Sequence, residues 1–547
     1  MLGRRQRLTG FLGGAFSLVA IGIFVGVAIL ALLHYGGEGG LTVLFSDPLL
    51  LSVLRFTLLQ AALSTALSVI LAIPVARSLA RQTRFLGRMW VIRLMAVPMG
   101  LPVLIGALGL IGIWGRQGLI NDGLLLLGKA EPVSIYGLGG ILLAHVFFNL
   151  PLAARLMLAG LERLPSEYWL MSATLGMKSG AIFRFIEWPA LRPLIPGIAG
   201  LVFMLCATSF TLVLILGGGP AATTLEVAIY QALRFDFDPE RAVSLAFLQI
   251  AVTALILVAM ALFPAPAEHG KTLGRPPRRF DGLGLKARLS DSTALVAAVL
   301  FLTLPLGAVV VAGLRADLLK LLTEEAFLRA AATSLAIALG SALSALLLAL
   351  ATIHAQTVIS LLRRPSLTMK GISVLLSGVS SLVLLVPTIV LATGWFMALR
   401  SMGDIASFAP VVVVGINALM ALPFVMRVVA PALATHRAAT ARLVFSLGIA
   451  GFSKLRLIDW PLLKKPLLTA LSFAMALSLG DLGAVALFGS EKITTLPWLI
   501  YNRMGHYRTN DADGFALILG LICLLLTLAG TTGAQSRKDD VENAGPV

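Results

Sequence analysis

The sequence contains few cysteines and few charged residues for a chain of 547 residues. Its only two cysteines, Cys206 and Cys523, both fall inside long apolar runs. This excludes a disulfide framework and gives no indication of a cysteine-based metal site. Charged residues make up 13% of the chain and hydrophobic residues 58%, a balance that excludes an ordinary soluble globular protein.

The chain also lacks the residue patterns that mark enzymes. It shows no nucleophile–base pair, no carboxylate pair and no cluster of metal ligands, so we expect no catalysis, no cofactor and no metal. Gly270-Lys271-Thr272 resembles the end of a phosphate-binding loop, but Ala265 stands where that motif needs its earlier glycine, and no strand precedes it. A nucleotide site in this chain is therefore rejected.

Long apolar runs are the main feature that is present. A helix needs roughly 20 residues to cross a hydrocarbon core of about 30 Å. We therefore predict an all-α polytopic membrane protein of about twelve transmembrane helices, the first retained because no small-residue cleavage site follows it. The predicted spans lie near residues 14–34, 53–76, 94–115, 136–158, 196–216, 242–263, 293–314, 330–353, 371–399, 409–426, 466–489 and 514–533.

The formal net charge of +17 comes from 43 Lys and Arg against 26 Asp and Glu. Such an excess could suggest nucleic-acid binding. If the N-terminus is cytoplasmic, however, most of these basic residues fall in the termini and the even-numbered loops, which is the positive-inside pattern of membrane proteins. We therefore expect cytoplasmic termini, contact with membrane lipid and no nucleic-acid partner.

The chain repeats itself at about half its length. Four matches occur in the same order, at offsets of 271 to 285 residues. Because each half carries six predicted spans, an even number, the halves should be parallel. We predict a first transmembrane half at 1–263, a basic cytoplasmic linker at 264–292 and a second transmembrane half at 293–547. The matches pair 57–68 with 333–344, Pro102 and Gly109 with Pro387 and Gly394, Pro151 and Arg155 with Pro423 and Arg427, and 223–230 with 494–501.

A polar loop motif recurs in both halves, with a glycine thirteen residues before a proline. A glycine that ends a short helix readily takes the left-handed conformation, and a proline suits the first turn of the next helix. We therefore predict a helix–turn–helix at the membrane face in each half, with first helices at 166–175 and 438–447. The motif residues are Gly176, Ile186, Glu187, Trp188 and Pro189 in the first copy, and Gly448, Ile458, Asp459, Trp460 and Pro461 in the second.

This motif resembles the cytoplasmic EAA loop of permease subunits in ATP-binding-cassette (ABC) importers. The resemblance implies that each loop forms a coupling helix that docks on an ATPase subunit. The Glu-Ala-Ala triplet itself is not kept, so the resemblance carries over the glycine turn but no acidic contacts. The triplet positions hold Leu170-Met171-Ser172 and Arg442-Leu443-Val444.

The fused halves are similar to ferric-iron-type and thiamine-type permeases, and residues 144–152 and 217–233 resemble the thiamine type. This resemblance implies import of thiamine or its phosphate esters across a bacterial inner membrane. It also implies two cytoplasmic ATPase subunits, which would hydrolyse the ATP, and a periplasmic substrate-binding protein. The alternatives are a ferric-iron permease and an ion-coupled secondary transporter, although the latter needs more ionisable groups near midplane than these spans contain.

Three residues inside the spans are candidates for the translocation path. Asp481 could balance the positive charge of thiamine, or it could form a gating or packing hydrogen bond. Its repeat counterpart is Ser209. His145, with apolar neighbours on both sides, is either a hydrogen-bonded core histidine or a transport residue.

A last group of candidates lies near the face opposite the repeated loops. The two tyrosines could belong to the interfacial aromatic belt or to a receptor-docking surface. The candidate receptor-facing residues are Thr223, Thr224, Tyr230, Thr494, Thr495 and Tyr501.

Overall fold

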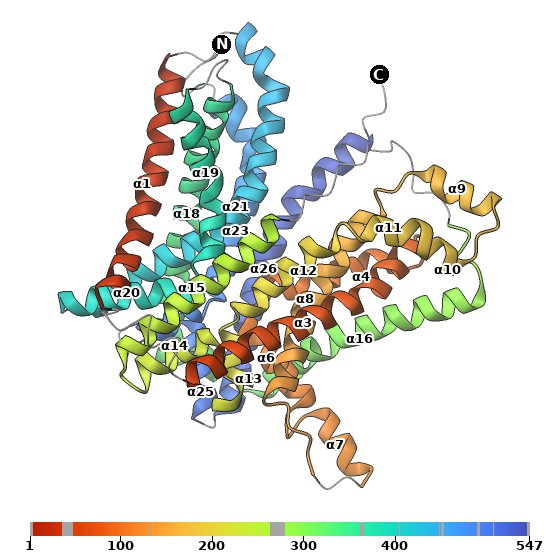
Figure 1. Ribbon diagram of the computed structural model, residues 1–547, viewed down its shortest axis with the longest axis horizontal. Coiled ribbons are helices and arrows are strands. Elements are labelled where there is room, and N and C mark those ends of the chain that lie inside the picture. Colours follow the sequence, from red (N-terminus) through yellow and green to blue (C-terminus); the bar gives the residue numbers. More distant parts are fainter. Residues whose placement is uncertain are drawn as a thin grey trace. The chain divides into compact units, whose positions relative to one another are not determined.

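All regular elements in the described part of the chain are helices, and no β-strand occurs there (Figure 1). The structure is a computed structural model. It describes residues 4–35, 48–128, 131–262, 279–361, 366–403, 405–447, 449, 453, 455–489, 493–506 and 508–543. The prediction of an all-α fold is confirmed.

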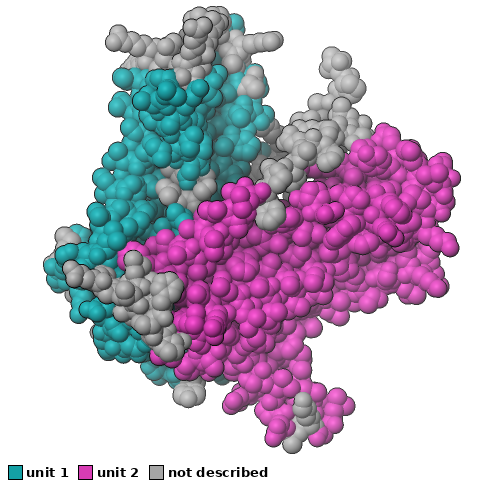
Figure 2. All heavy atoms as spheres, viewed as in Figure 1, with its two compact units in different colours: residues 1–41, 229–246, 316–547 teal, residues 42–228, 247–315 magenta. Residues whose placement is uncertain are grey.

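The chain forms two compact units, coloured separately in Figure 2. Unit 1 comprises Met1–Leu41, Ile229–Ala246 and Ala316–Val547, and unit 2 comprises Thr42–Ala228 and Phe247–Arg315. The units do not follow chain order, because the first helix belongs to unit 1 and helix α16 (Leu285–Arg315) belongs to unit 2. The two units therefore differ from the two predicted repeat halves, and the boundaries of those halves stay a prediction.

Unit 2 is built around α3, which packs against α8, α12 and α16, while α16 also packs against α6. The helices that lie wholly within unit 2, besides α16, are α3 (Pro48–Arg81), α4 (Arg88–Leu94), α5 (Val97–Gly100), α6 (Val103–Trp114), α7 (Leu119–Leu126), α8 (Leu138–Leu161), α9 (Ser166–Thr174), α10 (Ser179–Ile182), the π-helix η1 (Phe183–Glu187), α11 (Trp188–Leu191), α12 (Ile195–Ala207), α13 (Thr211–Leu216) and the 3₁₀ helix η2 (Pro220–Ala222).

Unit 1 repeats this arrangement, since α18 packs against α21, α23 and α1, while α1 also packs against α20. Its helices are α1 (Arg4–Tyr35), α17 (Leu318–Thr323), α18 (Glu325–Ser360), α19 (Leu367–Leu385), α20 (Thr388–Met402), α21 (Ile405–Ser446), the π-helix η3 (Leu455–Asp459), α23 (Trp460–Leu479), α24 (Gly483–Phe488), α25 (Leu496–Gly505) and α26 (Thr509–Asn543). Helices α14 (Leu225–Arg234) and α15 (Pro239–Ala261) each contribute residues to both units.

Small residues mark the buried faces of these helices. On α18, alanines recur at three- and four-residue spacing and are buried, whereas the leucines between them are exposed, as expected for a lipid-facing side. The buried alanines are Ala338, Ala342, Ala345 and Ala349, and the exposed leucines are Leu335, Leu339, Leu343 and Leu347.

Two repeat-equivalent glycines hold the first helix of each half. A Cβ on Gly109 of α6 would lie 2.4 Å from the carbonyl oxygen of Pro305 on α16. A Cβ on Gly394 of α20 would lie 2.4 Å from the carbonyl oxygen of Ala28 on α1. Each glycine therefore permits a helix contact that no other residue allows without a backbone shift.

Ten helices among the described residues are long and apolar enough to cross a membrane, or eleven if the pair Ser179–Leu191 and Ile195–Ala207, bent by 61°, counts as one span. The predicted number of twelve is not confirmed there. The run predicted as one span over 371–399 forms two helices, because Pro387 lacks the N–H that would continue α19 and instead precedes α20.

Two further predictions need correction. Residues 438–446 are not a separate helix but the end of α21, because Arg437 stands where the first copy has the helix-breaking Pro165. The linker predicted over 264–292 lies outside the described residues as far as 278. Beyond that, Arg279 is buried and α16 already begins at Leu285, so the last residues of the predicted linker belong to a long helix.

Candidate coupling site and translocation path

The first repeated loop turns at Gly176, as predicted. Helix α9 ends at Thr174, and Gly176 has a φ of +62°. The Met177 N–H donates to the Ser172 carbonyl at 2.9 Å, and the Gly176 N–H donates to the Ala173 carbonyl at 3.1 Å. This is a Schellman turn, in which a side chain at the left-handed position would be strained.

The segment after the turn is not a simple α-helix. Short α10 leads into the π-helix η1, and Pro189 lies in the first turn of α11. The second copy has the equivalent π-helix η3, and Pro461 lies in the first turn of α23. The sequence motif predicted that both prolines lie in the first turn of a helix. It did not predict the π-helices, which are frequent at functional sites.

The motif residues differ in exposure between the copies. Trp188, Trp460, Pro189 and Pro461 are exposed in both, whereas Ile186 is half-buried and Ile458 is buried. Asp459 Oδ1 lies 2.8 Å from His436 Nε2. Gly448 lies outside the described residues, so the second glycine turn stays a prediction.

Glu187 lies at the centre of a buried charge network that sequence reasoning missed. Its carboxylate accepts hydrogen bonds from Arg77 Nε and from Arg279 Nη2, each at 2.6 Å, and its side chain is fully buried. Arg279 also donates to both oxygens of Asp281, at 3.0 and 2.8 Å. Arg81 then lies 3.4 Å from both Asp281 and Asp291. Three arginines thus face three carboxylates.

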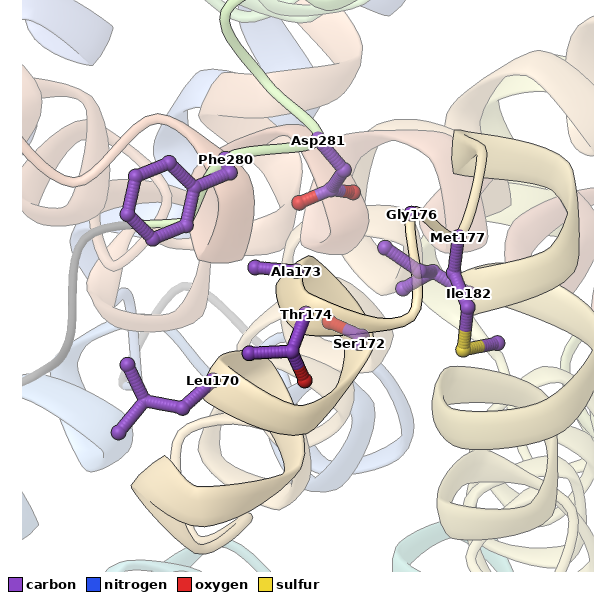
Figure 3. Close-up of a pocket in the computed structure, with 9 residues that line it drawn as sticks. All are labelled: Leu170, Ser172, Ala173, Thr174, Gly176, Met177, Ile182, Phe280 and Asp281. Atoms are coloured by element: carbon purple, nitrogen blue, oxygen red, sulfur yellow. The ribbon is translucent and has the colours of Figure 1, made fainter.

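An open hollow of about 620 Å³ lies beside this network (Figure 3). Residues of α9 form one wall and the Gly176 turn forms its end, while Phe280 and Asp281 of the linker form the opposite wall. Leu170 and Phe280 are both about half exposed, at 55% and 52%. An apolar side chain from another protein could enter between them.

Asp481 and Ser209 lie in equivalent breaks between helices. Ser209 lies between α12 and α13, and Asp481 lies between α23 and α24, so neither is inside a continuous helix. The Asp481 carboxylate accepts hydrogen bonds from the N–H groups of Gly483 and Ala484, each at 3.2 Å. It therefore caps the start of α24, which gives this acid a structural role.

His145 lies on α8 and is almost fully buried. Its Nδ1 hydrogen bonds with Ser64 Oγ at 2.9 Å, and its Nε2 has no partner among the described residues. This environment favours the core-histidine interpretation. The two cysteines are likewise free and buried, and no cluster of metal ligands occurs among the described residues.

The threonines predicted to face a receptor are mostly inside the protein. Thr223, Thr224 and Thr495 are buried, and so is Tyr230, so their side chains cannot meet a docked protein in this structure. The reason is that each Thr-Thr-Leu segment hydrogen bonds with a long helix of its own unit or half, α3 for the first segment and α18 for the second. The Leu225 N–H donates to Thr57 Oγ1 at 3.0 Å and the Leu496 N–H donates to Ser334 Oγ at 2.8 Å. Thr494 and Tyr501 are half-buried.

Comparison with known proteins agrees with this architecture. Residues 68–265 match the family model described as "Binding-protein-dependent transport system inner membrane component". The chain is 48% identical over 527 residues to the thiamine transport system permease protein ThiP of Brucella abortus (strain 2308), covering 96% of both chains. It is 42% identical to ThiP of Salmonella typhimurium (strain LT2), over 99% of this chain and 100% of the relative. ThiP of Haemophilus influenzae (strain Rd) is 37% identical, with 94% and 95% covered. The chain therefore belongs to the thiamine transport system permease family of binding-protein-dependent inner membrane components.

Proposed function

We propose that this chain is the membrane-spanning subunit of an ABC importer that moves thiamine into the cytoplasm. The single observation that carries the proposal is near full-length identity of 37–48% to relatives named as thiamine transport permeases. Such coverage includes both repeat halves, so it supports a shared transport function rather than a shared domain. It also favours thiamine over ferric iron as the cargo, and an ATP-driven pump over an ion-coupled carrier.

The surface of the first repeated loop supports docking of an ATPase subunit. Exposed apolar side chains on α9 and in η1, with the glycine turn between these elements, form a surface suited to a protein partner. We infer that two ATPase subunits dock at the Gly176 and Gly448 loops, on the cytoplasmic side with both termini. A periplasmic substrate-binding protein would deliver thiamine on the opposite face. The exposed residues are Tyr168, Leu170, Met171, Leu175 and Phe185.

In this mechanism the chain itself hydrolyses nothing. Closure of the ATPase pair would push the coupling helices, and the bundles attached to them would switch the path between outward and inward access. The breaks at Ser209 and Asp481 are places where helices that line a path could bend. A contact between Asp481 and cationic thiamine remains a proposal, while His145 is proposed only as a packing residue.

Uptake by cells tests the function. A bacterial strain without its own thiamine permease would receive this chain together with the ATPase and binding protein of its transport system. We expect labelled thiamine to accumulate above the level given by the same plasmid without the permease, and labelled ferric iron not to do so. Accumulation of iron but not thiamine would replace the proposal with the ferric-iron alternative. Thiamine uptake that persists without the ATPase would favour the ion-coupled carrier.

A further inference from the structure

The end of the inter-half linker is built into the first coupling site. Residues 279–282, here called the strap, lie within the linker and precede α16. Although they are a loop, Arg279 and Gly282 are buried. Buried charge in a loop is rare unless its partners are fixed, so the contacts of the strap are informative.

Arg279 fixes the strap to the coupling loop. Its guanidinium carbon lies 3.9 Å from the centre of the Trp169 ring on α9, and its Nη2 pairs with Glu187 in η1. One arginine therefore touches both arms of the helix–turn–helix. Burial by itself would lower the pKa of Arg279, but hydrogen bonds with Asp281 and the charge of Glu187 raise it, so the group stays charged.

The other side of the strap is fixed to the end of α3. Asp281 pairs with Arg81 of α3, and Gln82 donates to the Gly282 carbonyl at 3.2 Å and to Asp291 of α16 at 2.9 Å. Side chains at the end of α3 thus hold the strap in place, and Asp291 of α16 contacts these side chains. The strap is therefore a bridge between the end of α3 and α9.

This bridge places Phe280 on the docking surface. Phe280 cannot join the buried network, and its ring stands at the rim of the hollow opposite Leu170 (Figure 3). We propose that Phe280 is part of the first ATPase-docking site, and that an apolar side chain of the ATPase subunit enters between Phe280 and Leu170. Arg279 is the positioning residue that holds Phe280 there. This inference rests on the proposed function, and it makes the site composite, drawn from the linker as well as from the EAA-like loop.

Photo-crosslinking of the permease–ATPase complex tests the proposal. Benzoylphenylalanine would replace Leu170, Phe280 or Leu319, the last being 80% exposed on α17 and predicted to face the periplasm. We expect the probes at 170 and 280 to crosslink to the ATPase subunit and the probe at 319 not to do so. A crosslink from 170 without one from 280 overturns this inference alone. Crosslinks from neither position overturn the proposed docking itself.

A second arm tests the role of Arg279. With the probe at 280, Arg279→Ala should lower the crosslink yield at least fivefold, because its loss releases the strap from Trp169 and Glu187. Arg288→Ala, which removes an exposed arginine of α16, should leave the yield unchanged. If Arg279→Ala yields no folded protein, Arg279→Lys replaces it, since lysine keeps the charge but cannot pair with two carboxylates in the same plane. An unchanged yield in either folded variant contradicts the positioning role.

Discussion

Glu187 and Asp459 occupy equivalent positions in the two repeated loops but have different surroundings. Glu187 is fully buried between Arg77 and Arg279, whereas the Asp459 side chain is 19% exposed and pairs with His436. A buried carboxylate depends on its partners, because removing one leaves uncompensated charge at a cost of about 3–5 kcal/mol. The acidic residue before Trp-Pro therefore pairs with two arginines in the first loop and with a histidine in the second.

Asp481 is the residue whose role most needs a direct test. Because it caps α24 through two backbone N–H groups, Asp481→Asn, which keeps an acceptor oxygen, should weaken the cap only modestly. If its charge also balances thiamine, Asp481→Asn should lower the transport rate at least fivefold, and Asp481→Glu should retain more activity. Affinity of the binding protein for thiamine should not change. Equal transport by both variants would leave the residue with its capping role alone.

The sequence predicted these residues individually but not their partners. Glu187 stood out through the repeated motif, yet Arg77 and Arg279 lie 110 and 92 residues away in the chain. No local pattern reports such pairs. Asp481 stood out as an acid in an apolar run, but its capping role depends on a helix break that hydropathy does not register.

At the scale of elements, the Gly176 turn determines how α9 meets η1. Gly176→Val places a β-branched side chain at a φ of +62°, at a cost of roughly 1–3 kcal/mol. We expect thiamine uptake and retention of the ATPase subunit in detergent to fall, while the amount of permease in the membrane stays the same. Gly180→Val is the matched control, since Gly180 has no positive φ and open space around its Cβ position. Full ATPase retention in Gly176→Val would remove the coupling-helix assignment.

The close helix contacts at Gly109 and Gly394 give a second prediction. Either glycine changed to valine should force α6 from α16, or α20 from α1, since even a Cβ would lie 2.4 Å from a carbonyl oxygen. We expect each variant to unfold at a temperature several degrees lower in detergent, as measured by thermal aggregation. Gly307→Val on α16 should behave like wild type, because nothing lies within 4 Å of its Cβ position. Equal melting of all four proteins would contradict the packing described.

Element types were predictable from long apolar runs, but their ends and breaks were less so. The α19–α20 break at Pro387 and the break at Asp481 interrupt runs that remain apolar throughout, so composition gives no signal there. Helix α21 continues into the second loop because Arg437 stands where the first copy has Pro165, a difference that the repeat motif concealed. The strap, by contrast, is held by side chains of distant helices, which a reading of its own composition cannot reveal.

At the scale of the whole molecule, the repeat predicted two similar halves, and the recurring helix contacts agree with it. The sequence could not show that α1 packs with helices of the second half and α16 with those of the first, because pairing between distant helices leaves no periodic signal. Charge placement did predict an orientation, and the proposed docking of an ATPase at the repeated loops depends on it.

Thiol labelling checks this orientation. In a chain without Cys206 and Cys523, a cysteine at Arg288 should resist a membrane-impermeant reagent in intact cells and react after permeabilisation. A cysteine at Leu319 should react in both conditions. Arg288 and Leu319 are both exposed, so a cysteine at either position is open to the reagent. Arg279 is buried and would resist labelling in either orientation. Labelling of position 288 in intact cells would reverse the assignment.

The most direct measurement is thiamine uptake by proteoliposomes that contain this permease with its ATPase subunits. With the binding protein and labelled thiamine outside, and ATP and Mg²⁺ sealed inside, thiamine should accumulate above its external concentration. Accumulation should stop when a non-hydrolysable ATP analogue replaces ATP, and it should be at least fivefold slower with Gly176→Val than with Gly180→Val. Accumulation that proceeds without ATP hydrolysis, or that is driven by an ion gradient, would contradict the account.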